Sequence, residues 1–178
     1  MRYTLTTDEL KKIKAELRVG DTVFLSGTVY TSRDAAHKRI FELIEKKKIL
    51  PYEIKDALIY YAGPTQARPG TVIGSCGPTT SGRMDKFAPR LYDLGLLASI
   101  GKGVRSPEVI DAIKRNNALY FCAVGGAGAL AAQHIVKAEE IAFFDLGCES
   151  VKKLYMEKFP LFVAIDTLGN DIYNREVR

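Results

Sequence analysis

Hydrophobic and polar positions alternate with two different periods in the first half of the chain, and each period predicts a different element. Residues 8–17 have the spacing of a short helix, and residues 32–48 repeat apolar side chains at helical spacing. Between them, residues 19–32 are rich in valine, threonine and tyrosine, which predicts a strand pair or one long bent strand. Residues 57–63 and 71–77 predict two further strands, and each of them runs into the same tripeptide, Gly-Pro-Thr.

The second half of the chain alternates helical and β patterns more regularly. Helices are expected at 84–94, 107–116 and 127–135, and strands at 96–101, 118–124 and 140–145. Residues 161–173 read as a strand, a Gly-Asn turn and a second strand. A β-rich first third followed by βαβα units indicates an α/β fold with a mixed sheet and helices, which we expect to be one domain over residues 1–178.

Composition agrees with a protein that has a substantial core. The chain has 178 residues, of which 47% are hydrophobic and 26% charged. Its first residues contain no apolar run like the core of a signal peptide, and no stretch approaches the roughly 20 apolar residues of a membrane span. We therefore expect a cytoplasmic protein with no membrane contact.

The net charge of +5 is spread along the chain. The densest basic run, at 45–48, suits the end of a helix, and no nucleic-acid-binding motif accompanies it, so we expect no nucleic-acid partner. A mild positive excess does suit a protein that handles small anions. The cysteines Cys76, Cys122 and Cys148 are widely spaced without a CxxC pair, which argues against zinc sites and disulfides. Cys122 is expected in the core.

The strongest candidate site is the segment Gly-Pro-Thr-Thr-Ser-Gly-Arg at 77–83, expected between a strand and a helix. Its glycines allow a ligand to approach the backbone, and Thr79, Thr80 and Ser81 supply hydroxyl groups. Arg83 adds a bidentate donor for a carboxylate or a phosphate. The segment lacks the Gly-Lys-Ser/Thr of a Walker loop, so we interpret it as an anion site of another kind.

Two further cations follow predicted strands. Arg33 precedes a helix, where a positive charge opposes the helix dipole, and such local inconsistencies concentrate at functional sites. Lys102 lies between Gly101 and Gly103, which we expect to expose it. Because the ends of strands in open α/β sheets converge, Arg33, Arg83 and Lys102 are expected to form one crevice that suits a dicarboxylate.

A competing interpretation uses residues 124–145. Gly126-x-Gly128-x-x-Ala131 follows a predicted strand, and Asp145 comes 19 residues after Gly126, as in a dinucleotide-binding fingerprint. Too few residues follow Asp145 to complete such a fold. Small residues for close helix–sheet packing are the alternative explanation, and a nucleotide-binding module stays the competing function.

Several motifs together resemble a known family. GPTTSGRMDKF, TSRDAAH, YYAGP, GKG, VGGAGALAA and the closing FPLFVAIDTLGND resemble the C-terminal domain or β subunit of iron–sulfur (class I) fumarate hydratases, from about residue 4 to 174. The β subunits of L-tartrate dehydratases are close relatives. The resemblance implies a swivelling β/β/α domain that takes part in the reversible dehydration of (S)-malate to fumarate.

The resemblance also implies cofactor, partner and residue roles. A [4Fe–4S] cluster would be held by three cysteines of a separate α subunit, in an αβ dimer of dimers, and this chain would hold no metal. Arg33, Arg83 and Lys102 match substrate-binding positions, with Thr80 beside them, and Thr79 matches the residue proposed to take part in proton abstraction at C3. A threonine is a poor base unaided, so an acidic residue of the α subunit is expected to assist.

The resemblance favours malate over tartrate as the substrate. Tartrate enzymes carry methionine at the position of Gly82 and cysteines near the Arg-Asp-x-x-His segment, where this chain has Ala35 and Ala36. The β subunit of L-tartrate dehydratase remains the alternative. His37 and Cys76 receive no role.

Overall fold

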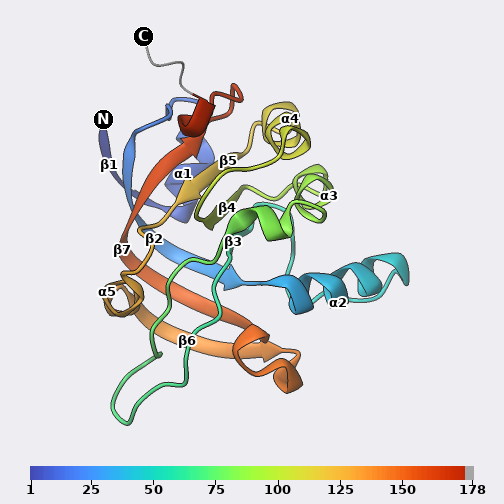
Figure 1. The fold of residues 1–178 in the computed structure, drawn as a ribbon, viewed down its shortest axis with the longest axis vertical. Coiled ribbons are helices and arrows are strands. Elements are labelled where there is room, and N and C mark those ends of the chain that lie inside the picture. Colours follow the sequence, from blue (N-terminus) through green and yellow to red (C-terminus); the bar gives the residue numbers. More distant parts are fainter. Residues whose placement is uncertain (175–178) are drawn as a thin grey trace.

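Over residues 1–174, which the computed structural model describes, seven strands pair in the order β1-β2-β3-β4-β5-β7-β6 (Figure 1). The strands are β1 Arg2–Thr6, β2 Thr22–Thr31, β3 Leu58–Tyr60, β4 Ala98–Gly101, β5 Leu119–Cys122, β6 Ile135–Ala142 and β7 Val151–Ile165. The α-helices are α1 Thr7–Ile13, α2 Asp34–Glu45, α3 Ala88–Asp93, α4 Pro107–Arg115 and α5 Gly128–Gln133. Short 3-10 helices are η1 Ser81–Met84, η2 Phe144–Glu149 and η3 Ile172–Asn174. The predicted α/β class with a mixed sheet is confirmed.

The sheet closes on itself through its longest strand. Strands β1 to β5 are parallel to their neighbours, whereas β7 runs antiparallel to both β5 and β2. One end of β7 pairs with β5, and its middle pairs with β2 over eight residue pairs, so the path β2-β3-β4-β5-β7 forms a circuit. Closure satisfies strand edges that would otherwise expose backbone groups, and it leaves β1 and β6 at the margins.

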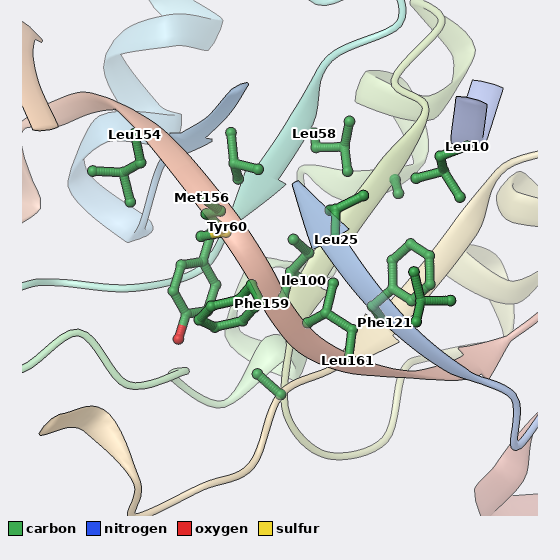
Figure 2. Close-up of a cluster of buried hydrophobic side chains, with 14 of the residues drawn as sticks. Leu10, Leu25, Leu58, Tyr60, Ile100, Phe121, Leu154, Met156, Phe159 and Leu161 are labelled. Carbon is green, nitrogen blue, oxygen red and sulfur yellow. The ribbon is translucent and has the colours of Figure 1, made fainter. Parts of the chain in front are cut away.

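Within this circuit, strands β3 and β4 are buried on both faces and β5 nearly so, whereas β2 and β7 alternate buried residues with less buried ones. Along β3, Leu58 and Tyr60 point into the closed sheet, where Phe121 and Leu161 join them (Figure 2). Ile59 points the other way, into a second core under the helices. Helices α2, α3 and α4 cover that outer face (Figure 1). Each fully buried aliphatic side chain contributes about 1.5–3 kcal/mol, and this two-sided burial holds the strand ends in register.

The prediction of a strand at 71–77 is wrong, because these residues belong to one long loop that contains both Gly-Pro-Thr tripeptides. Tertiary contacts replace the strand pairing. The Tyr60 hydroxyl donates to the Cys76 carbonyl at 2.7 Å, and the Cys76 amide donates to the Gly128 carbonyl at 3.0 Å. A Cβ on Gly77 would lie 3.3 Å from Gly128 Cα, so this close approach depends on both glycines.

The structure also differs from the sequence prediction at strands that lack a clear apolar pattern. The sequence interpretation missed β1 and most of β6 and β7. Strand β6 has only one fully buried residue, Ile135, and pairs only with β7, so it lacks the apolar pattern of a strand buried on both faces. It ends at Ala142, so the strand expected at 140–145 overlaps only the last three residues of β6, and Phe144 and Asp145 belong to the 3-10 helix η2. The expected final strand is reduced to one bridge, Ile165 with Asp171, followed by η3.

The remaining elements lie close to expectation. The segment 19–32 contains one long strand, β2 at 22–31, with an irregularity in its pairing to β7 between Leu25 and Gly27. The helix expected at 84–94 is split into η1 and the shorter α3. No helix within residues 1–174 is both long and apolar enough to cross a membrane. That a single domain extends over all of residues 1–178 stays a prediction.

Candidate active site at the carboxyl ends of the parallel strands

The predicted site residues follow the carboxyl ends of parallel strands. Arg33 lies just after β2 and Lys102 just after β4, and the four strands β2 to β5 run in the same direction. The segment at 79–83 comes to this edge from the long loop after β3. Parallel strands present their carboxyl ends at one edge, which is where open α/β sheets bind ligands.

Backbone contacts seat the segment at 79–83 on this edge. The Thr79 amide donates to the Tyr61 carbonyl at 2.7 Å, and the Ser81 amide donates to the Lys102 carbonyl at 2.9 Å. Thr80 forms an isolated parallel bridge with Lys102. The structure thus brings together Thr79, Thr80 and Lys102, which lie more than 20 positions apart in the chain.

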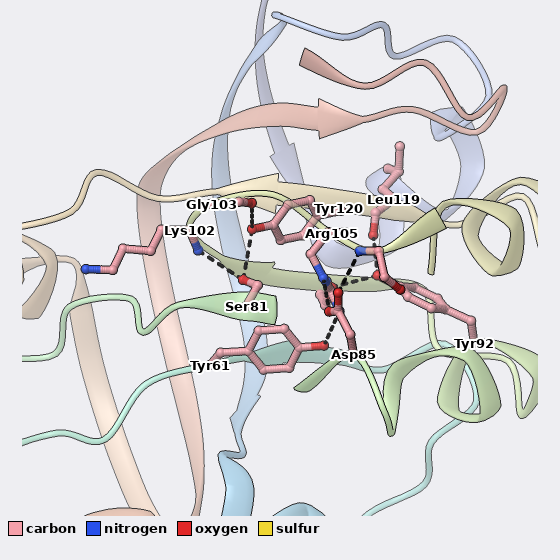
Figure 3. A network of polar contacts seen from close by, with 11 residues as sticks. Tyr61, Ser81, Asp85, Tyr92, Lys102, Gly103, Arg105, Leu119 and Tyr120 are labelled. Atoms are coloured by element: carbon pink, nitrogen blue, oxygen red, sulfur yellow. Dashed lines mark hydrogen bonds and ion pairs between the residues drawn. The ribbon is translucent and has the colours of Figure 1, made fainter. Parts of the chain in front are cut away.

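The three hydroxyls of this segment have different surroundings. Ser81 is fully buried, and its Oγ accepts from the Lys102 amide at 3.1 Å and from the Tyr120 hydroxyl at 2.8 Å (Figure 3). The expectation that Ser81 offers its hydroxyl to a ligand is therefore wrong. Within residues 1–174, the hydroxyls of Thr79 and Thr80 and the Lys102 ammonium have no hydrogen-bond partner in the protein. These groups are free to meet a ligand.

Arg83 is exposed and does not lie at the start of a long helix. The segment forms the single turn η1, and α3 begins only at Ala88, so anion binding by a helix N-terminus is not available here. The Arg83 side chain is 53% exposed, and its Nη2 lies 3.0 Å from Asp34 Oδ2. This ion pair links η1 to the first turn of α2, where Arg33 also lies.

Arg33 occupies the N-cap position of α2, and it makes no capping hydrogen bond with its own side chain. The preceding hydroxyls do not cap the helix, because Thr31 Oγ1 donates to the Ser150 carbonyl at 3.3 Å and Ser32 Oγ lies 2.9 Å from His37 Nδ1. Glu149, at the end of η2, performs this role: its Oε2 accepts from the Ala35 amide at 3.1 Å, and its Oε1 lies 3.2 Å from Arg33 Nη2. One distant carboxylate thus offsets a cation at the positive end of the helix, which explains the local inconsistency in the sequence.

The Arg33 guanidinium also depends on a glycine. A Cβ on Gly63 would lie 2.6 Å from Arg33 Nη1, so the side chain can pass only because Gly63 has none. The Nε of Arg33 is buried without a hydrogen-bond partner. A buried donor of this kind is costly unless a ligand or a partner chain accepts from it.

His37 and Cys76 are buried groups behind the site. His37 Nδ1 lies 2.8 Å from the Arg33 carbonyl oxygen and 2.9 Å from Ser32 Oγ. Burial lowers the pKa of His37 to about 4, so the imidazole is neutral near pH 7. Burial raises the pKa of the Cys76 thiol to about 12, so this cysteine stays protonated and unreactive near pH 7. Cys122, expected in the core, is only partly buried.

Gly125 and Gly128 leave room for neighbouring residues, which favours packing as the explanation for them, whereas a Cβ on Gly126 would meet no atom within 4 Å. A Cβ on Gly125 would lie 3.4 Å from Lys102 Cδ, so Gly125 leaves room for the lysine side chain. Strand β7 separates β5 from β6, whereas a dinucleotide fingerprint needs neighbouring parallel strands. Asp145 lies in η2 and pairs with Arg39 at 2.5 Å. The nucleotide-binding interpretation therefore fails on topology.

A buried ion pair between Arg105 and Asp85 supports the site, and the sequence interpretation missed it. Arg105 Nε donates to Asp85 Oδ1 at 2.7 Å, and Asp85 Oδ2 accepts from the Ser106 amide at 2.6 Å (Figure 3). The Arg105 guanidinium lies over the rings of Tyr61 and Tyr120. This pair joins the segment after η1 to the loop that carries Lys102. Nothing in the sequence around Arg105 marks it as buried.

The chemistry of the assembled edge follows from these contacts. Arg33, Arg83 and Lys102 bring three positive charges, and Asp34 and Glu149 offset two of them. Lys102 is exposed and Arg83 half exposed, so these two groups face outward, whereas the Arg33 side chain is only 19% exposed. Such a surface can bind a small carboxylate and place a hydroxyl next to it. The cysteines cannot act together, because Cys76 is buried in the core, Cys122 lies in β5 and Cys148 in η2.

Comparison with known proteins gives a consistent result. The model of the family described as fumarase C-terminus matches residues 1–176. The chain is 40% identical over 173 residues to the anaerobic class I fumarate hydratase of Escherichia coli (strain K12), which covers 94% of this chain and 32% of that protein. It is 38% identical to fumarate hydratase 2 of Leishmania major, covering 94% of this chain and 30% of that one.

A third relative has nearly the same length as this chain. The putative L(+)-tartrate dehydratase subunit beta of Methanocaldococcus jannaschii is 37% identical over 179 residues, which covers 97% of this chain and 91% of the relative. By contrast, the chain spans only about a third of the length of the fumarate hydratases that it matches.

Proposed function

The chain belongs to the fumarase C-terminus family, and from this membership we propose that it is the β subunit of a hydro-lyase that reversibly dehydrates (S)-malate to fumarate. The proposal is supported by the Thr80–Lys102 bridge and by the Arg83–Asp34 ion pair beside Arg33, which lie where β4 and β2 end. A malate or fumarate dianion needs such cations, and an outward-facing cluster suits a site that a second chain completes.

Each residue has a role that its position supports. Arg33 and Arg83 bind the substrate carboxylates, because a planar guanidinium matches a carboxylate with two parallel hydrogen bonds. Lys102 adds a further positive charge, and Thr80, which is bridged to it, offers a hydroxyl. Thr79 takes part in removing the proton from C3. Since a threonine hydroxyl is a weak base, we propose that a carboxylate of the partner chain assists it.

The cofactor of this proposal belongs to the partner. Within residues 1–174, no group of three or more histidine, cysteine, aspartate or glutamate side chains could hold a metal. The described residues therefore do not fit an iron–sulfur cluster. We propose that a separate α subunit holds a [4Fe–4S] cluster with its own cysteines and that the two chains assemble as an αβ dimer of dimers in the cytoplasm.

L-tartrate is the second candidate substrate. It is favoured by the relative of matching length, whose name is that of a tartrate dehydratase β subunit. Malate and tartrate carry the same two carboxylates, so Arg33 and Arg83 would serve either one. The choice between them depends on how the site accommodates the additional hydroxyl of tartrate.

The proposal is tested by reconstitution with the α subunit under anaerobic conditions. The mixed chains are expected to convert (S)-malate to fumarate, followed by fumarate absorbance, and L-tartrate is assayed in parallel. Neither chain alone is expected to turn over either substrate. Full activity of the isolated chain, or inactivity of the assembled complex on both acids, would contradict the proposal.

Arg83→Ala provides the residue-level test, with Arg90→Ala as its control. Both arginines form one ion pair and are about half exposed, at 53% and 48%. Loss of a charge-assisted contact to the substrate is expected to lower kcat/KM by about a hundredfold in Arg83→Ala. Arg90→Ala is expected to match the wild type, and equal activity of the two variants would exclude Arg83 from substrate binding.

A further inference from the structure

The backbone of Lys102 is held on both sides by a single residue. Ser81 Oγ accepts from the Lys102 amide at 3.1 Å, and the Ser81 amide donates to the Lys102 carbonyl at 2.9 Å. The Lys102 side chain leaves this contact and extends away from the network (Figure 3). Ser81 therefore sets the point from which the ammonium group projects.

Ser81 is itself held in place by Tyr120 of the core. It is fully buried, and the Tyr120 hydroxyl lies 2.8 Å from Ser81 Oγ and 2.9 Å from the Gly103 carbonyl oxygen. Tyr120 is fully buried within β5. The hydroxyl of one core residue thus contacts both the segment at 79–83 and the loop after β4.

The glycine before Lys102 makes this contact possible. A Cβ on Gly101 would lie 2.0 Å from Ser81 Oγ and 3.0 Å from Tyr61 Cδ2. The missing side chain of Gly101 therefore lets the loop after β4 pack directly against Ser81. A tightly packed contact with three hydrogen bonds holds both segments in one geometry.

We propose that Ser81 is a positioning residue that sets Lys102 against Thr79 in the dicarboxylate site. The inference rests on the function proposed above. Ser81 does not touch the substrate, because its hydroxyl is buried and already paired. It acts through Lys102, whose ammonium must reach a substrate carboxylate while the Thr79 hydroxyl reaches the neighbouring carbon.

The test is a double-mutant cycle on the assembled α and β chains. Ser81→Ala is expected to raise the KM for malate about tenfold, with kcat changed less than about threefold. In a Lys102→Ala background the same substitution is expected to change KM by less than about twofold, because its effect passes through the lysine. Ser26→Ala is the control, since Ser26 Oγ also accepts from a backbone amide, that of Lys158 at 3.0 Å, but lies on the first part of β2.

A second readout is independent of turnover. Amide hydrogen exchange at Lys102 is expected to become at least about tenfold faster in Ser81→Ala, because that amide loses its acceptor, while exchange in the other strands stays unchanged. Ser26→Ala is expected to leave Lys102 exchange as in the wild type. If Ser81→Ala does not fold, Tyr120→Phe, which removes one contact to Ser81 Oγ, is measured in its place, with a smaller effect in the same direction.

The outcomes separate the inference from the function on which it rests. Additive effects of Ser81→Ala and Lys102→Ala on KM, or unchanged Lys102 exchange, would overturn the positioning role. A wild-type complex inactive on both malate and L-tartrate would instead overturn the proposed function, and the exchange experiment would still decide whether Ser81 holds Lys102.

Discussion

Arg105→Met is expected to destabilise the protein far more than the same change at a surface arginine. The Arg105 side chain is fully buried and that of its partner Asp85 is 14% exposed. Methionine keeps most of the apolar volume but removes the charge and every donor. Asp85 would then retain only the hydrogen bond from the Ser106 amide.

The magnitude follows from what the guanidinium contacts. It donates to Asp85 at 2.7 Å and to Ser99 Oγ at 3.0 Å, and it lies 4.8 Å from the centre of the Tyr120 ring. Breaking a buried ion pair by removing one partner costs about 3–5 kcal/mol. Because solvent reaches part of Asp85, we expect the lower end, about 3 kcal/mol.

Arg115→Met is the matched control. Arg115 donates to both oxygens of Asp93 at 2.8 and 2.7 Å, and the two side chains are 49% and 45% exposed. Exposed pairs of this kind contribute about 0.2–1 kcal/mol. The two arginines therefore form carboxylate contacts of nearly equal length in different surroundings.

The assay is urea unfolding followed by circular dichroism, which yields the free energy of unfolding of each variant. The reasoning predicts a difference of about 2 kcal/mol or more between Arg105→Met and Arg115→Met. Adding Asp85→Asn to Arg105→Met is expected to recover part of the loss, because a neutral amide replaces an unpaired carboxylate. Equal destabilisation by the two arginine variants would refute the argument that burial decides the contribution of the pair.

Two further predictions concern groups packed behind the site. Burial holds the pKa of His37 near 4, below its value of 6.5 in the unfolded chain, so the unfolded state binds the extra proton and stability is lost as the pH falls from about 6.5 to about 4. The loss at pH 5 is about 2 kcal/mol, and urea unfolding at pH 7.5 and pH 5 should show it in the wild type but not in His37→Gln. Gly101→Ala is expected to lower the melting temperature by about 5 °C or more, because the new methyl would lie 2.0 Å from Ser81 Oγ. Gly82→Ala, whose methyl meets only the Val104 carbonyl at 3.8 Å, should melt within about 2 °C of the wild type, and similar melting of the two alanine variants would contradict the close contact at Gly101.

The sequence predicted an element correctly where a segment with one hydrophobic pattern lies in one kind of surroundings. Strands β3, β4 and β5 lie close to their predicted positions because each belongs to a short, mostly apolar run, and helices α2 and α4 do so because their apolar residues recur at helical spacing. It misled at 71–77, where a β-like composition belongs to a loop held by Tyr60 and Gly128. It also missed most of β6, which has only one fully buried residue and gives no such pattern.

Some residues of the site could also be predicted from the sequence, and others could not. Arg33, Thr79, Arg83 and Lys102 could be selected from residue type and from their expected places after strands. Glu149 could not, because it pairs with Arg33 from 116 positions away, and only the course of β7 brings it there. Ser81 was selected for the wrong reason, since burial decides whether a hydroxyl faces a ligand or supports a neighbour.

The sequence by itself determined which chemical groups this protein has, the α/β class of its fold and the family to which it belongs, since these depend on residue types and short periods. Tertiary structure alone decided which hydroxyls are free, which carboxylates pair with the arginines, and that Gly101 and Gly125 make room for neighbouring side chains. The physical reason is that burial and close approach depend on segments distant in the chain. The contact between Ser81 and Lys102, for example, joins two segments that lie 21 positions apart, so no local pattern could predict it.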